Sequence, residues 1–289
     1  MIEFQQLSKS FKKTAVLKSI SVNIDSGNRV ALVGSNGAGK TTLIRCLLGE
    51  YHCKGTVRVS GLDPMEHRQD VLKRIGFVPQ LPPPLKMPVG QLLNFSASVC
   101  DANVADMKQV ALRLGLDVDN LWHRPFVKLS GGQKQKLLIS IALGRDSDIL
   151  IMDEPAANLD PQARHIFFQL LAEKPKNTVM LISSHRLDEV ASLVNRVIEM
   201  DQGKIVLDDR VADLVEMSSQ LNCRVTLIQA EEAFSNAMQQ WGFNDIADGK
   251  VWEGKVAGPD RLRFLGTLSR YAGLLASIHL DESGENYHA

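Results

Sequence analysis

The chain lacks several features that would assign it to a class of protein at once. It has four cysteines in 289 residues, at positions 46, 53, 100 and 223, and no C-x-x-C pair. Its seven histidines show no metal-ligand spacing either. This pattern is typical of a reducing cytosol, and it argues against a disulfide framework or a structural zinc site.

Net charge and long apolar runs are also missing. Lys+Arg and Asp+Glu both number 33, so the formal net charge is zero and no bulk field attracts nucleic acid or an anionic membrane. No stretch approaches the roughly 18 uninterrupted apolar residues of a membrane span. The first residues, Met1–Gln6, lack the basic-then-apolar layout of a signal peptide. We therefore expect a cytosolic chain that does not bind nucleic acid.

One glycine-rich stretch dominates what is present. It fits the pattern G-x-x-x-x-G-K-[ST], and it lies between an apolar, strand-like run and a helix-like run. Its glycines let backbone N–H groups converge on a phosphate at a helix N-terminus, while the lysine reaches the outer phosphates and the threonine hydroxyl can ligate Mg²⁺. An ordinary glycine turn would not need the flanking strand and helix. We therefore predict a nucleotide site formed by Gly34, Ser35, Asn36, Gly37, Ala38, Gly39, Lys40, Thr41 and Thr42.

The order of elements predicts an α/β fold. Short strand-like segments cover residues 2–33, and strands then alternate with helices up to residue 207, which indicates a parallel sheet. Residues 88–145 interrupt this alternation with three helical patterns and no convincing strand. Prolines at positions 82–84 and 88 make the entrance to this helical insertion a stiff connector.

The C-terminal part has a pattern of its own. After a short helical linker over 211–217, the order is strand, helix, strand, strand, helix, strand, which matches the ferredoxin-like split βαβ motif. We therefore expect a first domain over residues 1–217 and a small α+β domain over 218–289.

A pair of carboxylates bears on the same chemistry as the glycine-rich loop. Asp153 and Glu154 follow the apolar strand Ile149–Met152, and ligands bind at the carboxyl ends of strands in an open α/β sheet. Asp153 can hold Mg²⁺ through water, and Glu154 can polarise an attacking water. A surface acidic pair is the alternative, which the preceding buried strand disfavours.

Three weaker signals complete the set. Leu129–Gln133 places two glycines at a helix start, which is either a second anion cradle or a plain helix cap. His185 follows the strand-like stretch 178–182, and Gln80 follows the strand-like stretch 75–78. Taken alone, neither residue indicates a function.

Together these motifs resemble a known family. GSNGAGKTT, LSGGQ, ILIMDEP, ANLD and SSH occur in the order and at the approximate spacing of the ATP-binding cassette (ABC) ATPases, over roughly residues 1–215. The resemblance implies a P-loop NTPase cassette with an N-terminal antiparallel β-subdomain and a helical subdomain at about 88–145. It also implies ATP and Mg²⁺ as cofactors.

The resemblance further implies a role for each motif residue. ATP-binding roles fall to Phe11, which would stack on adenine, to the glycine-rich loop, and to the signature residues Ser130, Gly131, Gly132 and Gln133, which would close on ATP bound to the other subunit. Thr41, Gln80 and Asp153 would serve the metal. Glu154 would be the catalytic base, assisted by His185 at the γ-phosphate and by Gln80 as a sensor. Asp160 would lie in the loop that crosses the dimer.

Two departures from the family pattern leave these groups in place. The cross-dimer loop reads Ala157-Asn158-Leu159-Asp160, where Ser or Gly is commoner than Asn. The signature is followed by Lys134-Gln135-Lys136, where Gln/Arg-rich sequence is usual. We therefore expect an active ATPase.

A lone cassette of this layout resembles the ATPase subunit of a membrane transporter, of the ABC-2 export-type group. Its length and small C-terminal unit are also similar to those of the ATPases of nitrous oxide reductase maturation. The implied partners are a second copy of the chain and an integral membrane subunit, with the ATPase on the cytoplasmic face of the inner membrane. A soluble cassette ATPase acting on a macromolecular complex is the alternative, and copurification with a membrane protein would separate the two.

Overall fold

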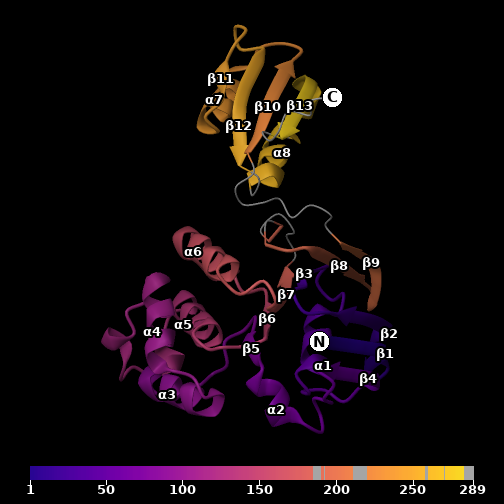
Figure 1. The fold of residues 1–289 in the computed structure, drawn as a ribbon, viewed down its shortest axis with the longest axis vertical. Helices are drawn as coiled ribbons and strands as arrows, with labels where there is room; N and C mark the ends of the chain where they lie inside the picture. Colours follow the sequence, from indigo (N-terminus) through magenta and orange to yellow (C-terminus); the bar gives the residue numbers. More distant parts are fainter. Residues whose placement is uncertain (185–189, 192, 211–219, 258–259, 270, 283–289) are drawn as a thin grey trace, which may run out of the picture. The chain divides into compact units, whose positions relative to one another are not determined.

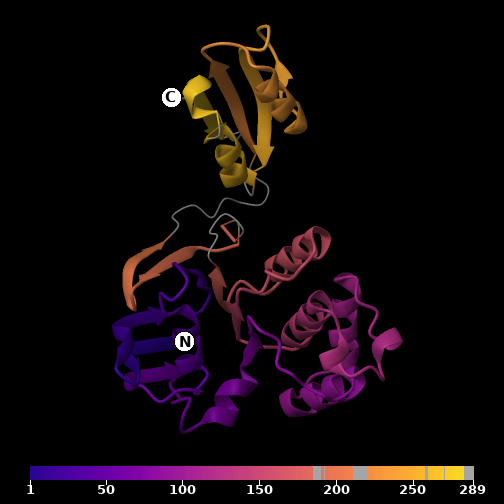
Figure 2. The ribbon, with the colours of Figure 1, turned by 180° about the vertical axis from the view of Figure 1, so that it is seen from behind.

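The structure is a computed structural model, drawn in Figure 1 and from behind in Figure 2. It describes residues 1–184, 190–191, 193–210, 220–257, 260–269 and 271–282. The chain divides into two compact units, Met1–Ala212 and Asp213–Ala289. Each unit is described by itself.

A six-stranded sheet forms the centre of the first unit, with the strand order β5-β6-β7-β3-β8-β9. Neighbours from β5 to β8 are parallel, and β9 pairs antiparallel to β8. β6 and β7 are buried along their whole length, as expected for parallel strands covered on both faces. The strands are β3 (Arg29–Val33), β5 (Ile75–Val78), β6 (Ile149–Asp153), β7 (Val179–Ser184), β8 (Arg196–Asp201) and β9 (Lys204–Arg210).

A smaller antiparallel sheet, of order β2-β1-β4, shares one core with one face of the central sheet. Its strands β1 (Ile2–Phe11) and β2 (Thr14–Ile24) extend further than their apolar residues indicate. Register shifts in their pairing let the ladder continue through polar residues, whose side chains lie on the exposed side. The third strand is β4 (Lys54–Val59), and the helices beside it are α1 (Lys40–Leu47) and α2 (Arg68–Lys73).

The helical insertion is confirmed as a separate cluster with its own core. It consists of α3 (Val89–Cys100), α4 (Val104–Arg113), the short turns η1 (Asp119–Leu121) and η2 (Phe126–Lys128), and α5 (Gly131–Leu143). Figure 1 shows these helices on the β5 side of the central sheet. Helix α6 (Pro161–Ala172) packs with the end of α5 in a second core on the other face of the sheet.

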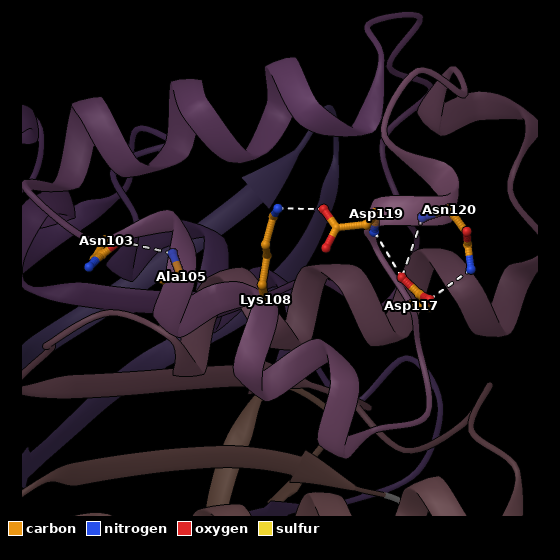
Figure 3. Close-up of polar contacts among 6 residues, drawn as sticks. All are labelled: Asn103, Ala105, Lys108, Asp117, Asp119 and Asn120. Atoms are coloured by element: carbon orange, nitrogen blue, oxygen red, sulfur yellow. Dashed lines mark hydrogen bonds and ion pairs between the residues drawn. The ribbon is translucent and has the colours of Figure 1, made fainter.

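Polar contacts on the surface of the insertion define where its helices begin and end (Figure 3). The Asn103 side chain caps α4, and the Asp117 carboxylate accepts the backbone N–H groups of Asp119 and Asn120 at 3.0 and 3.3 Å. Lys108 Nζ on α4 pairs with Asp119 Oδ1 at 2.5 Å. Such exposed ion pairs contribute little stability, so the role of these contacts is to set the path of the loop.

The second unit has the predicted βαββαβ order. Its sheet runs β11-β12-β10-β13 with every neighbouring pair antiparallel, which is the ferredoxin-like arrangement. It has its own buried core, which includes Phe234, Trp252 and Phe264. The elements are β10 (Gln220–Leu227), α7 (Glu232–Gln240), β11 (Asn244–Asp245), β12 (Val251–Ala257), α8 (Arg261–Ser269), η5 (Ala272–Leu274) and β13 (Leu275–Glu282).

Two expected helices cannot be compared with the structure. The helix expected over Leu187–Val194 falls largely outside the described residues, and the linker Val211–Met217 falls wholly outside them.

Because each unit has its own core, we expect the first unit to fold without the second. A protein truncated after Met217 should fold and bind ATP within a few-fold of the full chain, because the cores that the described residues form in the first unit include none from the second. Thermal melting and titration with a fluorescent ATP analogue would check this. An insoluble truncated protein, or one that has lost nucleotide binding, would show that the two units depend on one core.

Candidate nucleotide-binding site

The glycine-rich loop lies at the carboxyl end of β3, and α1 begins at its last residues. Gly34 and Gly39 have φ angles of 146° and 109°, which favour glycine. A Cβ at Gly34 would lie 2.3 Å from the Met200 carbonyl oxygen, and one at Gly39 would lie 2.8 Å from Leu17. The loop therefore cannot carry side chains at these two positions without moving its neighbours.

Helix α1 starts without a side-chain cap, since Gly39 occupies the N-cap position. The N–H groups of a first helical turn have no partners within the helix, and they favour an anion. A phosphate is the ligand that such an uncapped start after a glycine loop binds.

Lys40 is buried at the base of the loop. Its side chain is 6% exposed, and Nζ donates to the carbonyl oxygens of Gly34 and Ser35 at 2.7 and 3.2 Å. These bonds satisfy the buried ammonium and hold the loop in its curve. They also place a positive charge beside the N-terminus of α1.

A cleft of about 610 Å³ opens over the loop. Gln80 from the end of β5 and Glu154 from the end of β6 face each other across it, with Gln80 Nε2 donating to Glu154 Oε2 at 3.1 Å. The structure thus brings together residues that lie 74 positions apart in the chain. The lining residues are Val16, Asn36, Gly37, Gly39, Lys40, Thr41, Thr42, Gln80 and Glu154.

Asp153 is the last residue of β6 and precedes Glu154, which lines the cleft. It is 3% exposed, and its Oδ1 accepts a hydrogen bond from the Ser183 hydroxyl at 2.5 Å. A buried carboxylate and a threonine hydroxyl beside phosphate-binding N–H groups are the kind of oxygen donors that hold Mg²⁺ together with phosphate. Thr41 and Asp153 fit that donor set.

The signature residues lie elsewhere in this chain. Ser130 and Gly131 are exposed at the start of α5, and neither lines the cleft. Ser130 Oγ accepts the N–H of Gln133 at 3.2 Å, and Gln133 Oε1 accepts the N–H of Ser130 at 3.0 Å. This is a capping box, so the motif acts as a helix cap within one chain. A Cβ at Gly132 would lie 3.2 Å from the Asn158 carbonyl oxygen, so little room is left for a side chain there.

Asp160 joins the signature helix to α6. It caps α6 by accepting the Ala163 N–H at 2.8 Å, and it pairs with Lys136 Nζ at 2.8 Å. The hydrogen bond from Lys136, followed by that from Ala163, lowers the pKa of Asp160 below its ordinary value. A lowered folded-state pKa means that this link contributes stability above the unfolded pKa and is lost as the pH falls through the folded one.

Phe11, the residue expected to stack on adenine, is not among the residues that line the cleft. Phe11 ends β1, is 41% exposed and packs edge-on against Tyr51, with ring centroids 5.2 Å apart. Among the described residues, Val16 rather than Phe11 lines the cleft, so stacking by Phe11 on adenine stays a prediction. His185 lies outside the described residues.

Several residues at or near the site were not predicted from the sequence. Val16 carries no polar group that would mark it in the sequence. The contacts of Ser183 and of the buried Gln135, whose Nε2 donates to the Pro155 carbonyl at 2.9 Å, appear only in the tertiary structure. Their sequence signal is a polar residue within an otherwise apolar strand or helix face.

The fold and the cleft define a P-loop nucleotide-binding protein. Residues 17–157 match the ABC transporter family. The chain is 34% identical over 235 residues to Nod factor export ATP-binding protein I of Paraburkholderia xenovorans, covering 78% of this chain and 75% of the relative. It is 36% identical over 217 residues to the sulfate/thiosulfate import ATP-binding protein CysA of Shigella flexneri, covering 71% and 58%.

A solved structure shares the fold. It is a dimeric ATP-binding cassette in a post-hydrolysis state bound to ADP and Pi, with a TM-score of 0.64 and 20% identity over 74% of this chain and all of that one. The chain belongs to the ABC transporter ATPases. It is an ATP-binding, ATP-hydrolysing subunit of the kind that powers a membrane transporter. Among the described residues, none of the helices has the length and apolar character needed to cross a bilayer.

Proposed function

We propose that this chain works in pairs, with each ATP held between the glycine-rich loop of one copy and the signature residues of the other, and drives an export-type membrane subunit. The observation that carries this proposal is the separation of the two motifs within one chain. The cleft holds Lys40 and Glu154, whereas Ser130 and Gly131 are exposed and outside its lining. A second copy arranged head to tail supplies the missing wall.

In this proposal each predicted site residue has a role in ATP binding or hydrolysis. The N–H groups of the loop and Lys40 would bind the phosphates, and Thr41, Asp153 and Gln80 would hold Mg²⁺, which would neutralise phosphate charge. Glu154 takes a proton from the attacking water, and the hydrogen bond from Gln80 orients its carboxylate. As the family resemblance implies, His185 would contact the γ-phosphate, Phe11 would stack on the base, and Asp160 would lie in the loop that crosses to the second copy.

The membrane subunit docks on the helical insertion beside β5. The connector from Gln80 to Pro88 leads directly from the cleft into α3, so a change at the phosphate can reach this surface. Its exposed apolar side chains include Phe95 and Val99 on α3, which are 60% and 47% exposed, and Leu81 on the connector is 78% exposed. Phe95 and Val99 lie four residues apart, on one face of α3. An exposed apolar group of this kind favours a protein partner.

Two matched lysines test this docking surface. A cysteine is introduced in place of Lys86, on the β5 side, or in place of Lys204, on β9 at the opposite edge of the central sheet. We expect crosslinks to an integral membrane protein from position 86 and not from position 204, with the ATPase recovered at the cytoplasmic face. Crosslinks from position 204 alone would overturn the placement, and copurification with a ribosomal or other soluble complex alone would favour the alternative function.

The native cysteines can be controlled in this experiment. Burial raises the pKa of the Cys46 thiol to about 12 and that of the Cys223 thiol to about 11, so both stay protonated and unreactive near pH 8. Cys53 and Cys100 are half-buried, and serine at both positions gives a background for the introduced cysteine.

A further inference from the structure

Ser183 occupies a special place relative to the two carboxylates of the site. In the parallel pairing of β6 and β7, Ser183 is the register partner of Asp153. The side chains of register partners on adjacent strands lie on the same face of the sheet. Ser183 is fully buried and follows the apolar run 179–182 of β7. A hydroxyl in such a position needs partners, because an unpaired buried polar group destabilises the fold.

The Ser183 hydroxyl acts both as a hydrogen-bond donor and as an acceptor within the site. Ser183 Oγ donates its single proton to Asp153 Oδ1 at 2.5 Å, and it accepts the backbone N–H of Glu154 at 3.0 Å. The Ser183 carbonyl oxygen also accepts that N–H, at 3.2 Å. One residue therefore fixes the side chain of Asp153 and the backbone of Glu154.

The backbone of Glu154 needs such an anchor. Its φ is +47°, in the left-handed region that residues with a side chain rarely adopt. A conformation of this kind persists only where the surrounding contacts determine it. The two bonds to Ser183 are contacts of that type, and they aim the Glu154 side chain toward Gln80 in the cleft.

We infer that Ser183 is a positioning residue that holds the metal-binding Asp153 and the basic Glu154 in register with each other. This inference rests on the proposed function, because it assigns Ser183 through the roles of those two carboxylates. The hydroxyl is hydrogen-bonded to Oδ1 of Asp153, the carboxylate that would hold Mg²⁺ or its bound water. Loss of the hydroxyl removes the bond to the Asp153 carboxylate and one of the two Ser183 oxygens that accept the Glu154 N–H.

The test replaces Ser183 with Ala in the full chain, and Ser140→Ala is the matched control. Ser140 is also a fully buried serine, but its hydroxyl donates to the Lys136 carbonyl one turn earlier in α5. Both changes remove one buried hydroxyl, so thermal melting shows any general loss of stability. Ser183→Thr restores a hydroxyl and serves as the conservative variant.

The decisive readout is the effect of Mg²⁺ on nucleotide affinity. Affinity for AMP-PNP, a non-hydrolysable ATP analogue, is measured with Mg²⁺ and with EDTA. In Ser183→Ala we expect the Mg²⁺-dependent gain in affinity to fall about 10-fold or more, as outer-shell substitutions reduce metal affinity by about 10–100-fold. Affinity in EDTA should stay at the parent value, and Ser183→Thr should recover part of the gain.

The outcomes separate this inference from the function on which it rests. A parent protein that neither binds nor hydrolyses Mg²⁺-ATP would overturn the proposed function itself. A parent that is active, with a Ser183→Ala variant whose Mg²⁺ dependence and turnover equal those of Ser140→Ala, would overturn the positioning role alone.

Discussion

Glu154→Gln should bind ATP as the parent does and lose about 10²–10⁴-fold in the rate of ATP hydrolysis, which is the contribution of a positioned general base. The carboxamide keeps the shape of the side chain, and its oxygen can still accept the hydrogen bond from Gln80. It cannot take a proton from water. The expected result is therefore a normal nucleotide affinity with almost no steady-state phosphate release.

Glu173→Gln provides the control for this change. Glu173 forms a surface ion pair with Arg113 at 2.6 Å and lies at the end of α6, away from the lining of the cleft. The same loss of one carboxylate there should leave turnover unchanged. If Glu154→Gln hydrolyses ATP within a few-fold of the parent, the base is another group.

The second large effect is expected from defined heterodimers carrying Lys40→Ala and Ser130→Arg. If each site combines the loop of one copy with the signature of the other, both changes on one chain damage each site once. Placed on different chains, the two changes fall in one site and leave the other whole. Heterodimers with the two changes on different chains should therefore retain substantial ATP occlusion. Heterodimers with both changes on one chain should retain little.

The opposite order of ATP occlusion in the two heterodimers would contradict the shared site. Higher occlusion with both changes on one chain would show that each copy builds its own complete site. ATP occlusion, measured as bound nucleotide that survives rapid dilution, reports on the closed pair directly. Tagged copies purified through both tags ensure that only mixed pairs are measured.

Much of the fold could be predicted because its signals are local. The alternation of strands and helices, the interruption at residues 88–145 and the βαββαβ order of the second unit each depend on short stretches of chain. The ladder between β1 and β2 was harder to predict, since its polar residues pair through a bulged register that only the partner strand determines.

The same distinction applies to the site. The loop Gly34–Thr41 was recognisable because its backbone conformation, its lysine and the following helix are contiguous, and Asp153 and Glu154 because they end a buried strand. The contact between Gln80 and Glu154 depends on β5 lying beside β6, which no local pattern specifies.

By itself, the sequence of this protein determined the glycine-rich loop, the carboxylate pair at the end of a buried strand and the family, because each depends on consecutive residues with fixed backbone requirements. Only the tertiary structure decided that Ser183 forms hydrogen bonds with both Asp153 and Glu154, that Val16 lines the cleft, and that Ser130 caps its own helix outside it. Strand register and burial are set by contacts between distant segments, and these contacts exist only once the chain has packed.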